Sequence, residues 1–306
     1  MRRLFYSADS TPIMTTPTLA QRVMPLLFVL LWSTGFVGAK FGLPYAGPLT
    51  FLSTRYVLVI VLMVMLALAM RAPWPKSPRE AMHIGITGVL VQALYLGGVF
   101  VAIDRGLPAG VTALVVGMQP LLTALGAGFL LGERVSIRQW GGLALGFFGV
   151  SLVVSNKIAV DGMAPDELGT MLAPALLALI GITVGTLYQK RFCPRFDLRT
   201  GSIVQFVPTL ILTALIANQT ESMEITWSGE FVFALLWLVV VLSLGAISLL
   251  NLLIRSGSAV NVASLFYLTP PTTALIAWAM FGETLSGLAL AGMIVAVAGV
   301  WLARKA

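Results

Sequence analysis

The segment from Leu107 to Leu152 occurs twice in the chain, and its second copy lies 150 residues further on. No gap is needed to align the copies, so apolar composition alone is a poor explanation of the match. A repeat of this kind must be recognised before a fold is assigned, because it divides the chain into similar units. The identical residues are Ala109, Ala113, Pro120, Thr123, Ala124, Leu125, Gly132, Glu133, Gly142 and Gly149, which align with Ala259, Ala263, Pro270, Thr273, Ala274, Leu275, Gly282, Glu283, Gly292 and Gly299.

Long apolar runs fill both halves. The chain is 58% apolar and 10% charged, whereas soluble domains have about 45–50% and about 25%. Each run has about 20 residues, enough to cross a hydrocarbon core of about 30 Å. The sequence therefore predicts an all-α polytopic membrane protein. Ten transmembrane helices are expected at about 24–42, 48–70, 83–103, 109–131, 138–155, 169–189, 200–217, 231–253, 259–281 and 286–303.

The basic residues are divided unequally between the two sides of the membrane. Residues 1–22 are polar and are expected to form a disordered tail, which we place in the cytoplasm. That side then carries fifteen Lys and Arg residues, and the other side carries only Lys40, Arg105 and Lys157. Positive charge in short loops marks the cytoplasmic side, so both termini are predicted to be cytoplasmic.

An odd number of spans in each half has a consequence for topology. With five spans each, residues 23–155 and 169–306 would enter the membrane in opposite orientations, joined by an external linker at 156–168. Inverted repeats are typical of secondary transporters, in which the halves rock around a central site.

Arg55 is the sharpest candidate for a binding residue. It lies about seven residues into the second span, and its repeat equivalent is the polar residue Gln205. An intramembrane arginine is costly and normally faces the interior of the bundle or a cavity. It could bind an anionic substrate group; alternatively, it could bind helix carbonyls or extend to the membrane surface.

Some of the other polar and aromatic residues in the spans could line a substrate cavity, although individual residues of this kind more often serve in helix packing or as interfacial anchors. Pro120 and Pro270 lie in mid-span, where proline removes a backbone hydrogen bond and kinks a helix. We expect them to flank the site, with packing kinks as the alternative. Gly132-Glu133 and Gly282-Glu283 are expected to cap helix ends, with the glutamate near the positive end of the next helix. The candidate substrate-binding residues besides Arg55 are Trp32, Tyr95, Gln119, Tyr188, Asn251 and Tyr267.

Several classes of function lack the residues they need. Cys193 is the single cysteine and His83 the single histidine, so neither a disulfide framework nor a cysteine-built metal site is available. We therefore expect no catalytic residues, no metal and no cofactor. The net charge of +7 is distributed as membrane topology requires, and we expect no nucleic-acid partner.

The pattern resembles the drug/metabolite transporter superfamily, specifically its EamA-domain branch. The likeness covers roughly residues 22–304 and is carried by Trp32-Ser-Thr-Gly, Arg55-Tyr and the duplicated positions. It implies export of small metabolites, often amino acids or related compounds, across a bacterial inner membrane, with the substrate between the two repeats. No Asp or Glu lies in mid-span, so coupling to protons or to a counter-substrate stays open.

The leading hypothesis is thus an alternating-access exporter of a small polar metabolite. A drug or organic-cation exporter of the same fold is the alternative. A non-transporting scaffold or receptor would be expected to carry a large soluble region, yet no loop exceeds about 15 residues. An intramembrane enzyme would need a convergent catalytic set, which a chain with one histidine and one cysteine hardly offers. A channel would need a filter-like loop or a ring of charges, and neither is evident in the sequence.

Overall fold

The computed structural model describes residues 19–107, 109–155, 165–193, 195–281 and 286–304. Gly282 and Glu283, the expected second copy of the helix-ending pair, lie outside the described residues, as do residues 1–18 of the expected tail and most of the linker. The last four residues of the expected tail, 19–22, are the start of the first helix. The regular elements that the structure describes are helices, apart from one isolated antiparallel bridge between Ala46 and Ile225.

The helices follow the repeat closely. In the first half they are α1 Leu19–Gly42, η1 Leu43–Tyr45, α2 Pro48–Ala69, α3 Pro78–Gly88, η2 Val89–Leu96, α4 Gly97–Asp104, α5 Ala109–Val116, α6 Gln119–Leu131 and α7 Ile137–Ser155. In the second half they are α8 Pro165–Phe192, α9 Leu198–Thr220, α10 Gly229–Trp237, η3 Leu238–Ala246, α11 Ile247–Ser256, α12 Ala259–Ser264, η4 Leu265–Leu268, α13 Thr269–Phe281 and α14 Gly287–Arg304.

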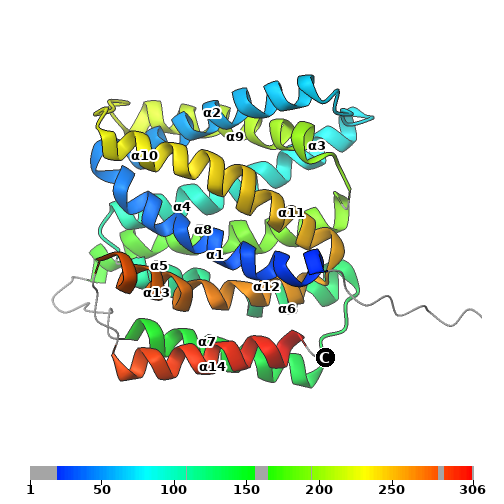
Figure 1. The fold of residues 1–306 in the computed structure, drawn as a ribbon, viewed down its shortest axis with the longest axis vertical. Coiled ribbons are helices and arrows are strands. Elements are labelled where there is room, and N and C mark those ends of the chain that lie inside the picture. Colours follow the sequence, from blue (N-terminus) through cyan, green and yellow to red (C-terminus); the bar gives the residue numbers. More distant parts are fainter. Residues whose placement is uncertain (1–18, 108, 156–164, 194, 282–285, 305–306) are drawn as a thin grey trace, which may run out of the picture.

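Most of these helices are long and apolar enough to span a membrane. Among the described residues, eight helical segments meet that condition, and two shorter apolar stretches lie in α1 and α7. The prediction of an all-helical chain is confirmed for the part that the structure describes. In Figure 1 the helices run side to side in stacked rows, and α1 begins at the same end of the bundle at which α14 finishes.

The two halves share their irregularities as well as their helices. The third span contains a π-helical segment, η2, and a π-helical segment, η3, begins 149 residues later at Leu238. The fourth span breaks between α5 and α6, and its repeat partner contains the 3₁₀ segment η4. Pro120 lies in the first turn of α6, where the missing N–H would be unpaired in any case. The proline thus marks a helix start and does not kink a continuous helix.

Two pairs of equivalent helices from the two halves pack against each other. α2 contacts α9, and α7 contacts α14; these pairs form the two outer rows of the bundle in Figure 1. The repeated glycines explain the second pair. A Cβ atom at Gly142 would lie 2.4 Å from the backbone nitrogen of Ala303, and one at Gly149 would lie 2.3 Å from that of Ala296. The glycines allow the two backbones to touch.

The α2–α9 pair is joined at both ends by equivalent threonines. At the start of α2 the Thr50 hydroxyl donates to the Glu221 carboxylate over 2.6 Å, and the same carboxylate accepts the N–H groups of Leu49 and Thr50. At the start of α9 the hydroxyl of Thr200, the repeat equivalent of Thr50, donates to the carbonyl of Pro73 over 2.7 Å. Each helix start is therefore bound by the loop that follows the other helix.

Gly132 and Glu133 end α6 as a cap, with one correction. Gly132 has φ +67°, the predicted left-handed conformation. Glu133 was expected at the start of the next helix, but its carboxylate accepts the N–H of Ala259 at the start of α12, over 3.2 Å. The reason is that α7 is already capped, because Ser136 and Gln139 each accept the other's backbone N–H, which is a capping box.

Candidate functional site

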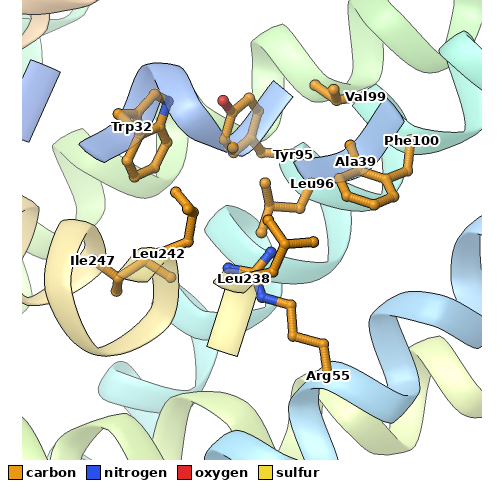
Figure 2. A pocket seen from close by; sticks show the side chains of 11 residues that line it. Trp32, Ala39, Arg55, Tyr95, Leu96, Val99, Phe100, Leu238, Leu242 and Ile247 are labelled. Carbon is orange, nitrogen blue, oxygen red and sulfur yellow. The ribbon is translucent and has the colours of Figure 1, made fainter. Parts of the chain in front are cut away.

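A small cavity lies where α1, α2, the η2–α4 span and the η3–α11 span meet (Figure 2). Its volume open to a water-sized molecule is about 40 Å³, room for a few waters at most, since one needs about 10–15 Å³. Typical ligand pockets hold about 300–1,000 Å³, so the site is closed in this conformation. Both halves contribute to its lining: Trp32, Gly35, Ala39, Arg55, Tyr95, Leu96, Val99 and Phe100 come from the first, and Leu238, Leu242 and Ile247 from the second.

Arg55 supplies the charged group of this cavity. Its side chain is 2% exposed and points into the cavity in Figure 2. The Nε atom donates to the Ser243 hydroxyl over 3.0 Å, and that hydroxyl donates to the carbonyl of Leu238 over 3.2 Å. The carbonyl lies five residues earlier in the π-helical segment η3, so the irregular helix positions the serine. No carboxylate among the described residues forms an ion pair with Arg55.

Aromatic rings form the wall opposite the guanidinium. Trp32 of α1 and Tyr95 of η2 are stacked, with centroids 6.2 Å apart and an interplanar angle of 8°. Phe266 of η4 meets the edge of Trp32 at 5.3 Å, and Phe28 lies 5.2 Å from the same ring. Tyr56 of α2 holds η2 in place, because its hydroxyl donates a hydrogen bond to the backbone carbonyl of Gln92 over 2.7 Å. Such rings are rigid and apolar and suit a small organic ligand.

A second, smaller cavity of about 20 Å³ shares Trp32 and Tyr95 with the first. Its other walls are Val116 and Gly117, between α5 and α6, and Phe266, Thr269 and Pro270, where the 3₁₀ segment η4 passes into α13. The Trp32–Tyr95 pair therefore separates the Arg55 cavity from the irregular parts of the fourth span and of its repeat partner. Broken helices expose backbone donors and acceptors, which is how many transporters hold polar substrates.

Buried polar side chains without a partner gather around these breaks. Gln119 is the first residue of α6 and Thr269 is the first residue of α13, 150 positions later. Gln119 is 0% exposed and Thr269 is 4% exposed. Both amide atoms of Gln119, the hydroxyl of Thr269 and the hydroxyl of Thr123 have no hydrogen-bond partner in the protein. Buried polar groups are normally paired; of these residues Thr269 lines the second cavity, where an external group could pair with its hydroxyl.

The structure brings some of the predicted site residues together and leaves others apart. Arg55, Trp32 and Tyr95 line the first cavity, and Pro270 joins Trp32 and Tyr95 at the second. Gln119 and Pro120 are buried at the neighbouring break. Ser243, Thr269 and Phe266 were not predicted. Aligning the repeat would have indicated Thr269, since it occupies the position of Gln119.

The remaining three candidates line neither cavity. The Tyr188 hydroxyl lies 2.6 Å from Nδ1 of His83, near the end of α8. The side-chain oxygen of Asn251 accepts a hydrogen bond from the Gln189 amide over 2.8 Å, between α11 and α8. Tyr267 packs against Gly146 of α7, and its buried hydroxyl is unpaired.

The described residues contain no group of three His, Cys, Asp or Glu side chains that could hold a metal ion. Acidic residues in this part of the chain lie at helix ends and in loops, such as Asp104, Glu133 and Glu221. The chemistry of the site is therefore that of a guanidinium, aromatic rings and neutral hydrogen-bonding groups.

Comparison with known proteins places the chain among membrane transporters. The model of the EamA-like transporter family matches residues 23–155 and again residues 169–304. A Salmonella typhimurium protein named "Probable amino-acid metabolite efflux pump" is 28% identical over 91% of this chain and 93% of its own length. A Bacillus subtilis protein named "Uncharacterized transporter YvbV" is 27% identical over 90% of this chain and 88% of its own.

A solved structure supports the fold. A protein described only as "Crystal structure of protein" superposes with a TM-score of 0.77 at 19% identity, over 92% of this chain and 96% of that one. At this identity the match concerns the fold alone. With both halves matched by one family model, the chain is a membrane transporter and belongs to the EamA-like transporter family.

Proposed function

We propose that this transporter exports small metabolites that carry a carboxylate, such as amino acids or related polar compounds, across a bacterial inner membrane by alternating access. The name of the Salmonella relative supports the substrate class. The observation that carries the proposal is the Arg55 guanidinium, which is buried in a cavity built by both halves and has no acidic partner among the described residues. A guanidinium binds a carboxylate through two parallel hydrogen bonds.

In this proposal the other site residues have distinct roles. Trp32 and Tyr95 hold the apolar part of the substrate, and Gln119 with Thr269 offers neutral hydrogen bonds beyond the aromatic pair. Pro120 and Pro270 keep the helices broken at these positions. Tyr188, Asn251 and Tyr267 would reach substrate only in a conformation that opens the bundle on their side.

The proposed topology is ten spans in two inverted repeats, residues 23–155 and 169–306, with both termini cytoplasmic. The matched irregularities and the packing of α2 on α9 and α7 on α14 support the repeat. The division of basic residues between the loops supports the orientation. The two halves would exchange inward-open and outward-open shapes.

No described carboxylate lines either cavity. We therefore propose that transport proceeds by exchange or facilitated diffusion, without a buried acid that carries protons. A pH gradient alone should then change the rate of substrate exchange little.

A second candidate function has one observation in its favour. The cluster of Phe28, Trp32, Tyr95 and Phe266 could hold an organic cation over the aromatic faces. Arg55 in the same cavity opposes it, because a second positive charge would be repelled at short range.

The test is counterflow in proteoliposomes loaded with one unlabelled compound at a time, with the labelled compound added outside. The panel contains neutral amino acids, nucleobases and a cationic dye. We expect accumulation of a few related amino acids, its loss in Arg55→Ala and partial retention in Arg55→Lys. Arg191→Gln, which removes an exposed arginine at the end of α8, is the matched control. Normal counterflow by Arg55→Ala would refute the role of Arg55, and accumulation of the dye alone would favour the second candidate.

A further inference from the structure

A large apolar groove lies away from the candidate site, between the α3–η2 span and α9. Its volume open to a water-sized molecule is about 640 Å³, far larger than either central cavity. Ten of its lining side chains are apolar and the eleventh residue is a glycine: Trp74, Ala81, Met82, Gly85, Ile86, Val89, Leu90, Ile203, Val204, Val207 and Pro208. Trp74 and Met82 are each 54% exposed, so the groove opens to the surroundings of the bundle.

Gly85 and Pro208 lie close together between α3 and α9. Gly85 contributes no side chain, and an atom added there would meet the Pro208 ring at 3.4 Å. Pro208 lies inside α9 and cannot donate a hydrogen bond to the carbonyl of Val204, four residues earlier. These two residues therefore form the part of the lining where the two helices come closest to each other.

The dimensions of the groove match one leaflet of a bilayer. From Ala81 to Leu90 the helix advances nine residues, or about 14 Å at 1.5 Å per residue. Half of a hydrocarbon core of about 30 Å is about 15 Å. The groove begins at the loop that carries Trp74, and tryptophan is typical of the membrane–water interface. A fatty acyl chain in this groove would lie parallel to the helices, with its head group beside Trp74.

The mouth of the groove is basic. Arg79 is exposed and lies one turn before Met82 on the same face of α3, and Lys76 is exposed in the preceding loop. Neither forms an ion pair with a described residue. Arg199 lies above Ile203 and Val207 on α9, but Asp197 pairs with it at 2.6 Å. The other acid here, Glu80, accepts the backbone N–H of Lys76 over 2.8 Å.

From this combination we propose that the groove binds an anionic phospholipid. The acyl chain fills the apolar groove, and Lys76 and Arg79 bind the phosphate and the anionic head group. Basic pockets between spans are known to select acidic lipids in this way. The site is separate from the transport cavity and does not depend on which compound is carried.

The experiment is native mass spectrometry of the protein released from nanodiscs that contain equal parts of phosphatidylglycerol and phosphatidylcholine. We expect the wild type to retain one phosphatidylglycerol in preference to phosphatidylcholine. Each basic residue removed should lower that preference about fivefold, equivalent to roughly 1 kcal/mol. Lys76→Gln with Arg79→Gln should therefore abolish the preference but keep some bound lipid.

A second variant separates the groove from the charges. Ala81→Trp fills the groove and leaves both basic residues in place, so it should lose the retained lipid altogether. Ala298→Trp, at an exposed position on α14, is the matched control and should behave as wild type. Equal retention of the two lipids by the wild type would overturn the proposal, as would a phosphatidylglycerol preference that survives in Ala81→Trp. A dimer that disappears in Ala81→Trp would also overturn it, because the occupant would then be a second copy of the chain.

Discussion

The contact between α7 and α14 offers a sharp test of the packing argument, because two neighbouring glycines in α7 have opposite surroundings. A Cβ atom at Gly142 would lie 2.4 Å from the nitrogen of Ala303 and 2.7 Å from the carbonyl oxygen of Gly299. A Cβ atom at Gly141 would have nothing within 4 Å. Gly142→Ala and Gly141→Ala therefore make the same chemical change one residue apart.

The expected difference follows from the geometry. Ordinary contact for a Cβ atom begins at 3.4 Å, so the backbones of α7 and α14 must separate by 1.0 Å in Gly142→Ala. Forcing an extra methyl group into a well-packed contact costs about 1–3 kcal/mol. Both variants also gain about 0.5–1 kcal/mol from replacing a helical glycine by alanine. This gain is common to both and cancels, so Gly142→Ala should be less stable than Gly141→Ala by about 1–3 kcal/mol.

The assay is equilibrium unfolding of the purified protein by titration with SDS in mixed micelles, followed by tryptophan fluorescence. Gly141→Ala should unfold at the same or a higher SDS fraction than the wild type, and Gly142→Ala at a lower one. Equal midpoints for the two variants would refute the claim that the repeated glycines hold the helices at backbone contact.

Three further predictions concern other parts of the molecule. Gln119→Leu removes two unpaired buried amide atoms, so it should raise stability in the same titration by about 1–3 kcal/mol. The same variant should show slower counterflow, because Gln119 is proposed to bind substrate; an unchanged rate would limit the residue to packing. Glu221→Ala removes the carboxylate that caps α2 and should cost about 0.5–2 kcal/mol, whereas Glu224→Ala, in the same loop, should cost nothing measurable. Burial raises the pKa of the Cys193 thiol to about 12, so the folded protein should resist maleimide at pH 7.5 and react only after unfolding; rapid labelling of the native protein would contradict the buried position.

Much of the fold could be predicted because a membrane restricts the choices. Runs of about 20 apolar residues allow little besides helices, and the described helices fall within a few residues of the predicted spans. The repeat also indicated which residues are equivalent, as Gly142 and Gly292 illustrate. What the pattern did not indicate is that Gly142 lies against Gly299, and Gly149 against Gly292, because partners in space are not encoded in an offset along the chain.

The site was harder to predict for a related reason. Arg55, Trp32 and Tyr95 were identified because their chemistry is unusual within apolar spans, and they line one cavity. Tyr188 and Asn251 have the same kind of chemistry, but helix rotation directs them to His83 and Gln189. A periodicity of 3.6 residues assigns faces only when one face is polar, and in lipid both faces of a helix are apolar.

Polar side chains at the ends of the α2–α9 pair and at the starts of α6 and α13 differ in their hydrogen bonding. At the ends of the α2–α9 pair, Thr50 and Thr200 are both hydrogen-bonded across the two halves. At the matched helix breaks, Gln119, Thr123 and Thr269 keep side-chain atoms that are buried and unpaired. Leaving such a group unpaired in an apolar environment costs several kcal/mol, and apolar residues of similar size would remove that cost. We infer that the unpaired polar groups at the starts of α6 and α13 serve a partner from outside the chain.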